Sequence, residues 1–176
     1  MDMRLISIRT QKKTILTLAA MAALFLYPQL ARSWGFWGHK AITRRAISSL
    51  PAECRAYFTQ NAKLLVKHSI DPDLWRKFDK AESNRHYIDI DMFGNFPFND
   101  LPHAYPDAVK KFGAKKIKKA GIVPWRIVEF TDSLAWAMKH KDRKLILRYA
   151  SALAHYVEDV HMPLHTVKNY NGQLSG

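Results

Sequence analysis

Residues Leu153 to His165, with the sequence LAHYVEDVHMPLH, contain three histidines and one aspartate that could bind a metal ion. His155 and Asp159 are four residues apart, so on a helix their side chains share one face, one turn from each other. Pro163 is expected to end that helix and to place His165 in the following turn. Neutral imidazole and carboxylate are ligands of a borderline cation such as zinc. The pattern therefore favours a metal site over a helix with satisfied polar residues.

The apolar periodicity of the chain predicts helices, and no alternating pattern is long enough to predict a β-strand. We expect an all-α helical bundle with long functional loops. Asp142 is a plausible N-cap for the helix that carries the ligands, which should run to about His161. On that helix Leu153, Val157 and Val160 should form an apolar stripe opposite the ligand face. The other expected helices are 41–50, 51–66, about 106–112, and a long one from Pro124.

Three further expectations concern these elements. The long helix from Pro124 should bury its apolar residues, Ile127, Val128, Leu134, Ala135 and Met138. Residues 69–76 should form a loop or a short turn of helix, residues 83–91 should begin another short element, and residues 95–105 should be irregular. No internal repeat and no low-complexity segment interrupts the pattern.

Residues 1–33 have the features of a secretory signal peptide. Basic residues precede an apolar run at 15–26, and small residues at Ala31 and Ser33 suit a signal peptidase. The alternative is a membrane anchor, but the run is short for a span and lacks a stop-transfer flank. We therefore expect a secreted or periplasmic protein that begins at Trp34 and keeps no transmembrane anchor after cleavage.

The chain carries a net charge of +13 and one cysteine, Cys54. A basic secreted protein favours polyanions or anionic lipid surfaces. Part of the charge lies in the lysine run 110–119, for which a solvated face and a binding patch both remain open. A single cysteine gives no disulfide framework, so a hydrophobic core and bound metal must supply the stability.

The segment HYVEDVHMPLH resembles the signature of the zinc-dependent phospholipase C superfamily, which includes single-strand-specific nucleases of the S1/P1 type. The resemblance implies that His155 and Asp159 bind zinc and that His165 binds a neighbouring zinc. The opening WGFWGH is similar to the mature start of the family. There the α-amino nitrogen and carbonyl oxygen of Trp34, together with His39, would bind a zinc. The resemblance covers nearly the whole of residues 34–176.

The segment RHYIDID resembles the part of the family that holds the zinc shared with HxxxD, which makes His86 a ligand. An upstream aspartate should complete that shell, and the candidates are Asp71 and Asp73. The nuclease pattern has an arginine or lysine three residues after the aspartate, and this favours Asp73. Arg76 would then be the cation that steadies the charge developing on phosphorus.

Two further positions, Tyr87 and Asp89, match those that stack on and hydrogen-bond a base in the nucleases, although Tyr87 could instead pack in the core. His161 is expected outside the metal shell. The remaining histidines lack ligand spacing and should be ordinary surface or loop residues: His68, His103 and His140.

The resemblance implies a phosphodiesterase that hydrolyses its substrate with the help of zinc, with three zinc sites in the family and two fully specified here. Asp159 would bridge two zincs that activate water. The third, at His165, needs a further histidine and an acidic residue, which we expect downstream of an apparently truncated domain. We favour single-stranded nucleic acid as substrate; a phospholipid is the alternative. A further alternative is an inactive zinc-binding fragment or interaction domain, and no stable protein partner is indicated.

Overall fold

The structure is a computed structural model that describes residues 35–170 and 172–175. The chain divides into two compact units, Met1–Arg32 and Ser33–Gly176, and every described residue belongs to the second. The expected signal peptide and Trp34 therefore lie outside the described residues. Within those residues the structure has helices and no β-strand, which confirms the all-α class expected from the sequence.

Helix α9 (Arg143–Val160) is the central element of the second unit and packs along α8 (Val123–Lys139). The carboxylate of Asp142 caps α9 by accepting a hydrogen bond from the backbone N of Leu145 (3.0 Å), as the sequence indicated. Pro124 lies in the first turn of α8, where its missing N–H removes no helical hydrogen bond. The N-terminal end of each of these two helices is therefore set by a local sequence signal.

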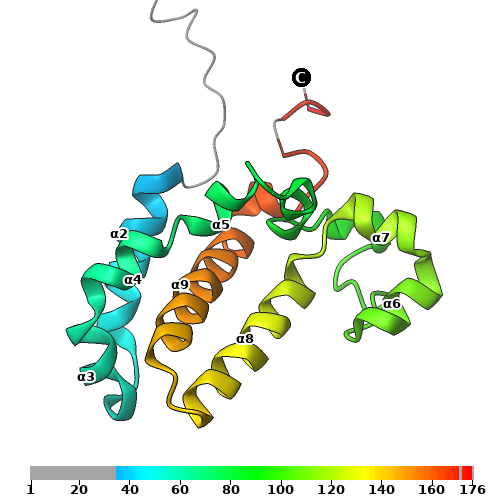
Figure 1. Cartoon of the computed structure of the whole chain (residues 1–176). Coiled ribbons are helices and arrows are strands. Elements are labelled where there is room, and N and C mark those ends of the chain that lie inside the picture. The colour runs from blue at the N-terminus through cyan, green and yellow to red at the C-terminus, as the bar shows by residue number, and fades with distance from the viewer. Residues whose placement is uncertain (1–34, 171, 176) are drawn as a thin grey trace, which may run out of the picture. The chain divides into compact units, whose positions relative to one another are not determined.

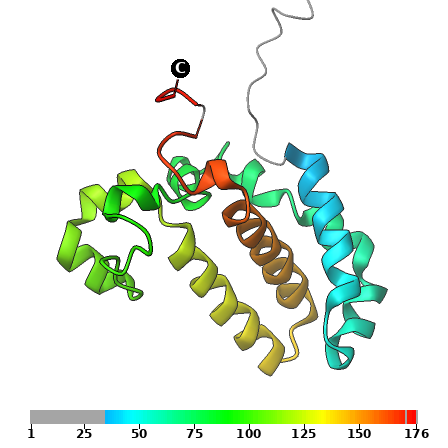
Figure 2. The same ribbon diagram turned by 180° about the vertical axis from the view of Figure 1, so that it is seen from behind.

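On its other side α9 contacts α2 (Gly35–Ser49) and α4 (Ala62–His68). Figures 1 and 2 show α9 between these helices and α8 from both sides. The helix expected over 51–66 is two helices, because α3 (Ala52–Gln60) ends before Asn61, whose backbone is not helical (φ −105°, ψ 10°). This break separates α3 from α4 and lets each contact α2.

Shorter elements complete the unit. All but one of them lie between α4 and α8 in the chain, and the last follows α9. Residues 69–76, expected to form a loop or a short turn of helix, contain a short helix, and the lysine run forms two helices separated by Gly113. The sequence indicated the first of these two helices but not the second. The elements are α5 (Asp71–Trp75), η1 (Lys80–Arg85), η2 (Ile90–Phe93), α6 (Tyr105–Phe112), α7 (Ala114–Ala120) and η3 (Pro163–His165).

Two hydrophobic clusters hold the helices together, and α9 contributes to both of them. One includes Phe130 of α8 and Tyr156 of α9, and the other includes Leu65 of α4 and Ile146 of α9. Burial of side chains of this size stabilises a fold by about 1.5–3 kcal/mol each. A helix packed on two sides in this way has little freedom to shift, and this fixes the residues that it carries.

The expected inward face of α8 was wrong in part. Val128 and Met138 are 56% and 46% exposed and Ala135 is also exposed, whereas Phe130 and Ala137 are buried. Apolar residues occupy more than one side of this helix, so periodicity alone could not select the side that faces α9. Only the packing against Tyr156 and its neighbours selects it.

The apolar stripe expected on α9 is less buried than the polar face opposite to it. Leu153, Val157 and Val160 are half-buried, while His155 and Asp159 are almost fully buried. The helix is covered on both faces, and its polar face lies deepest. Such burial of polar groups requires partners for each of them.

The segment after His86 is fixed against the end of α7 by backbone hydrogen bonds. The N–H of Asp89 donates to the carbonyl of Ala120 (2.6 Å), and the N–H of Val123 donates to the carbonyl of Tyr87 (3.3 Å). Gly121 lies between them with φ +92°, and a Cβ there would be 2.1 Å from the carbonyl oxygen of Tyr87. Only glycine allows this approach.

We predict that Gly121→Ala destabilises the protein by several kcal/mol or prevents folding, because its Cβ overlaps backbone rather than a side chain. Gly113→Ala is the matched control: its φ is +83°, but no atom lies within 4 Å of the added Cβ. The control should lose only about 1–3 kcal/mol from backbone strain. Urea unfolding monitored by circular dichroism measures both, and equal midpoints would contradict the prediction.

Candidate metal centre

The carboxylate of Asp159 is 1% exposed and lies among four histidines, two close to it in sequence and two from distant parts of the chain. Its Oδ2 is 2.9 Å from Nδ1 of His86 and 3.2 Å from Nε2 of His155. Its Oδ1 is 3.5 Å from Nε2 of His39 and 3.6 Å from Nδ1 of His165. The two oxygens thus face two different pairs of imidazoles.

Two sets of side chains have ligand atoms close enough to hold a metal ion. One set is His39, His155 and Asp159, and the other is Asp73, His86 and His155; within each set the atoms lie within 4.8 Å of one another. The two sets together contain the ligands proposed from the sequence that the structure describes, except His165. His165 belongs to neither set, although it lies near Asp159.

The choice between the two upstream aspartates has a clear geometric basis. Oδ1 of Asp73 is 3.9 Å from Nδ1 of His86, which places it at the centre. The carboxylate of Asp71 instead pairs with Nδ1 of His68 at 2.8 Å, and both of those side chains are partly exposed. The position of Asp73 agrees with the nuclease pattern, and its role as a ligand stays a prediction.

Three of the histidines are oriented by hydrogen bonds on the ring nitrogen Nδ1. His155 donates to the carbonyl oxygen of Ser69 (2.7 Å), and His165 donates to the carbonyl oxygen of His86 (2.8 Å). His39 donates to Oε2 of Glu158 at 2.6 Å. An oxygen acceptor on the second ring nitrogen is typical of histidines that bind metals, because it fixes the tautomer and the direction of the free nitrogen.

Glu158 and Glu82 support the centre from outside, and the sequence interpretation missed both. The other oxygen of Glu158 accepts from the hydroxyl of Thr43 (2.6 Å). Glu82 is 1% exposed, accepts from the hydroxyl of Tyr156, and lies 3.7 Å from Nε2 of His86. Glu158 lies beside a ligand, and Glu82 lies four residues before one. These were the available signals, although neither spacing identifies a partner.

The charge of Glu82 is balanced by two arginines. Nη1 of Arg85 is 2.6 Å and Nη2 of Arg126 is 3.6 Å from the carboxylate. Burial and the hydrogen bond to Glu82 raise the pKa of Tyr156, although Arg126 opposes that change, so the phenol stays a donor. A buried carboxylate that has several donors of this kind is a rigid support for the neighbouring His86.

The electrostatics of the centre favour an ionised carboxylate. Burial by itself raises the pKa of Asp159, but hydrogen bonds from His155 and His86 outweigh it and hold the pKa well below its ordinary value. Burial lowers the pKa of His155, and the hydrogen bond and charge of Asp159 outweigh it in turn and raise that pKa. A cation that binds to His155 must displace the proton that the raised pKa retains on the ring. The affinity for the cation therefore depends on pH.

These observations test whether the residues fit a metal. Nδ1 of His86 lies 2.9 Å from Oδ2 of Asp159 and 3.0 Å from Nε2 of His155, so two buried imidazoles converge on one buried carboxylate. Nitrogen and oxygen donors in this number suit zinc or a similar divalent cation. The donor set therefore fits a metal centre.

Residues proposed to act on the substrate lie at the edge of this centre. Arg76 is half exposed, with Nη1 3.6 Å from Oδ1 of Asp73. Tyr87 and Asp89 are half-buried, and the phenol of Tyr87 donates to the carbonyl of Lys119 (3.2 Å). Burial and the charge of Asp89 raise the pKa of Tyr87. Their roles toward a base stay predictions.

The histidines expected outside the metal shell lie outside it. His161 is exposed and hydrogen-bonds the carbonyl of Val157 (2.7 Å), and His103 and His140 are exposed too. His68 has the carboxylate partner described above. In the part of the chain that the structure describes, none of them joins the cluster around Asp159.

A comparison with protein-family models matches residues 34–174 to the S1/P1 nuclease family. The chain belongs to this family. S1/P1 nucleases are metal-dependent phosphodiesterases, so the match confirms the sequence-based resemblance, and the buried histidine–aspartate cluster could hold the metal. Comparisons with curated proteins and with solved structures gave no match. Among the helices described, none has the length and hydropathy needed to span a bilayer.

For this S1/P1 nuclease domain we predict that Glu158→Gln lowers zinc affinity by about 10- to 100-fold without unfolding the protein. A glutamine has one acceptor oxygen, so His39 and Thr43 cannot both keep their hydrogen bonds. Competition with a chromogenic chelator measures the affinity. Glu53→Gln, at an exposed position of α3, is the control. Equal affinities for the two variants would contradict the proposed support of His39.

Proposed function

We propose that the chain is a secreted, zinc-dependent endonuclease that prefers single-stranded nucleic acid. The observation that carries this proposal is the buried carboxylate of Asp159 between two pairs of histidines, in a chain of the S1/P1 nuclease family. A carboxylate in this position can hold two cations close together, which is an arrangement suited to phosphodiester hydrolysis.

The ligands divide into three groups. When bound, zinc supplies Lewis acidity that activates water and polarises the phosphoryl oxygens. A third cation, held in part by His165, would support the leaving oxygen. The first cation would be held by Asp73, His86, His155 and Asp159, and the second by Asp159, His39 and the amino terminus of Trp34.

Other residues of the chain position the substrate. Arg76, half exposed beside Asp73, binds the phosphate and stabilises the negative charge that develops on it. Tyr87 stacks on one base and Asp89 hydrogen-bonds its edge, which holds the neighbouring phosphate over the centre. Water adds to phosphorus, and the phosphorus–oxygen ester bond breaks, to leave a phosphate monoester and a free hydroxyl.

A phospholipid head group is the second substrate to consider, because the same metals and a basic surface suit both. The family match supports nucleic acid. A further alternative is a zinc-binding or interaction domain without activity. This alternative has the same metal centre, so only a measurement of catalysis separates it from the nuclease.

We predict that the zinc-loaded mature protein, with any natural sequence that follows residue 176, cleaves single-stranded DNA and RNA faster than duplex DNA. Tyr87→Ala should lower cleavage by about tenfold or more, because one base–aromatic stack contributes about 1–3 kcal/mol. Zinc content should not change. Tyr105→Ala, at a tyrosine of α6 that is 40% exposed, is the control. Head-group release from phosphatidylcholine without cleavage of nucleic acid would overturn the nuclease proposal.

Processing gives a separate test of the proposed terminal ligand. Amino-terminal sequencing of the exported protein should begin at Trp34. A variant that retains Ser33 should bind less zinc, because the free amine is moved away from the site that contains His39. Metal analysis of both forms checks this. Full zinc content in the longer form would rule out the amine as a ligand.

A further inference from the structure

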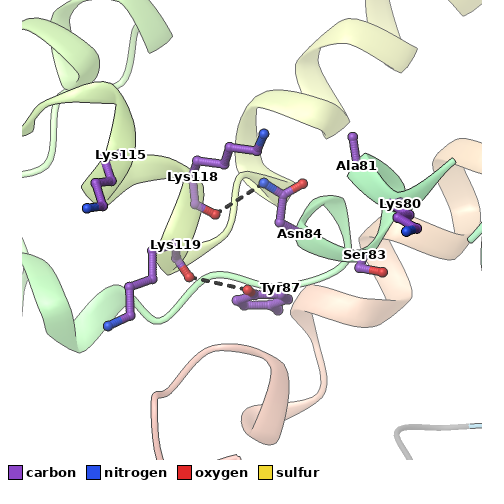
Figure 3. Close-up of a pocket in the computed structure, with 8 residues that line it drawn as sticks. All are labelled: Lys80, Ala81, Ser83, Asn84, Tyr87, Lys115, Lys118 and Lys119. Atoms are coloured by element: carbon purple, nitrogen blue, oxygen red, sulfur yellow. Dashed lines mark hydrogen bonds between the residues drawn. The ribbon is translucent and has the colours of Figure 1, made fainter.

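A groove of about 640 Å³ lies between η1 and α7. Four of its eight lining residues are lysines, and none is acidic. Figure 3 shows that the lysines come from both elements, with Asn84 and Tyr87 between them. We call it the lysine groove, and its lysines are Lys80, Lys115, Lys118 and Lys119.

Three of these lysines form one face of α7. Lys115, Lys118 and Lys119 are spaced as i, i+3 and i+4, so their side chains are neighbours, while Ile117 and Ala120 on the other side are fully buried. Like charges at this spacing destabilise a helix by about 0.2–0.5 kcal/mol per pair. A bound anion would remove that repulsion.

The structure divides the lysine run into groups with different environments. Lys111 binds the carboxylate of Asp100 (2.9 Å), and the ammonium group of Lys116 lies 5.0 Å from the ring centre of Phe112. The four lysines of the groove are exposed and form no ion pair with any described residue. The run therefore provides a patch whose charges have no partner within the described chain.

The lysine groove is held rigidly beside the proposed base platform. The amide of Asn84 donates to the carbonyl of Lys118 (3.1 Å), and the hydroxyl of Tyr87 donates to the carbonyl of Lys119 (3.2 Å). Figure 3 shows both bonds crossing from the η1 segment to α7. Tyr87 directly follows His86 in the chain, so the groove begins one residue from the metal centre.

We propose that the lysine groove binds backbone phosphates of a single-stranded nucleic acid next to the nucleotide held at Tyr87. This inference rests on the proposed function for its substrate, but the groove can bind a strand whether or not the centre cleaves it. Lysines that lie along the path of a nucleic-acid backbone, with an aromatic ring between them, are typical of surfaces that bind single-stranded nucleic acid. No large aliphatic side chain lines the groove, which favours a nucleic acid over a lipid surface.

The test compares two triple variants that remove the same charge. One is Lys115→Gln, Lys118→Gln and Lys119→Gln. The control is Lys63→Gln, Lys139→Gln and Lys144→Gln, at exposed lysines of α4, α8 and α9 that do not line the groove. Fluorescence anisotropy measures the binding of a labelled twelve-nucleotide phosphorothioate strand to the zinc-loaded protein between about 50 and about 200 mM salt.

The groove variant should bind the strand at least about tenfold more weakly at the lower salt concentration, and its logarithmic salt slope should fall by about 2. The control variant should bind nearly as well as the unmodified protein. Equal affinity and slope in the two variants would overturn the proposal. So would loss of binding to phosphatidylserine vesicles with oligonucleotide binding unchanged.

A cleavage assay separates this inference from the proposed function. In the groove variant, KM should rise for the twelve-nucleotide strand and stay unchanged for a dinucleotide, which is too short to reach the groove. If no form of the protein cleaves nucleic acid while the groove variant still loses strand binding, the nuclease proposal fails and the groove stands. If cleavage is normal and both variants bind alike, the groove proposal fails.

Discussion

The buried carboxylate of Asp159 is the interaction on which the rest of the structure depends. An ionised carboxylate at 1% exposure is unfavourable unless donors or cations surround it. Its partners are histidines on α2, on α9, after η1 and in η3, so four segments must meet around a single side chain. The packing of α9 between α4 and α8 makes this possible, because it places the polar face of α9 where those segments converge.

The groups that orient the histidines connect this centre to the surrounding helices. Glu158 fixes the ring of His39 from α2, and the carbonyl of Ser69 fixes His155 from the loop before α5. Glu82, which two arginines neutralise, supports His86. The contacts of Glu158 and Ser69 join residues far apart in the chain, and Glu82 joins His86 to Tyr156 of α9. Metal affinity and tertiary packing are therefore coupled, and a change in either should be felt by the other.

Local signals predicted much of the fold and of the centre. The cap at Asp142, Pro124 and the HxxxD spacing predicted α8, α9 and the shared face of His155 and Asp159, because each is a relation between residues close in sequence. The buried side of α8 and the partners of Glu82 and Glu158 depend on contacts between distant segments, which no spacing encodes. The break at Asn61 was also missed, since an apolar pattern can continue across a turn that interrupts the helix.

One short segment serves both the metal centre and the lysine groove. Along η1 and the residues after it, Glu82 and His86 are buried and face the centre, while Asn84 and Tyr87 line the groove. Backbone bonds to α7 hold the same segment in place, and Gly121 permits the close approach. A nucleic-acid strand in the groove would thus lie on the outer face of this segment. The inner face of the same segment carries His86, a proposed metal ligand. The position of the strand relative to the centre would be set by the rigid backbone rather than by a mobile loop, which favours precise placement of the scissile phosphate.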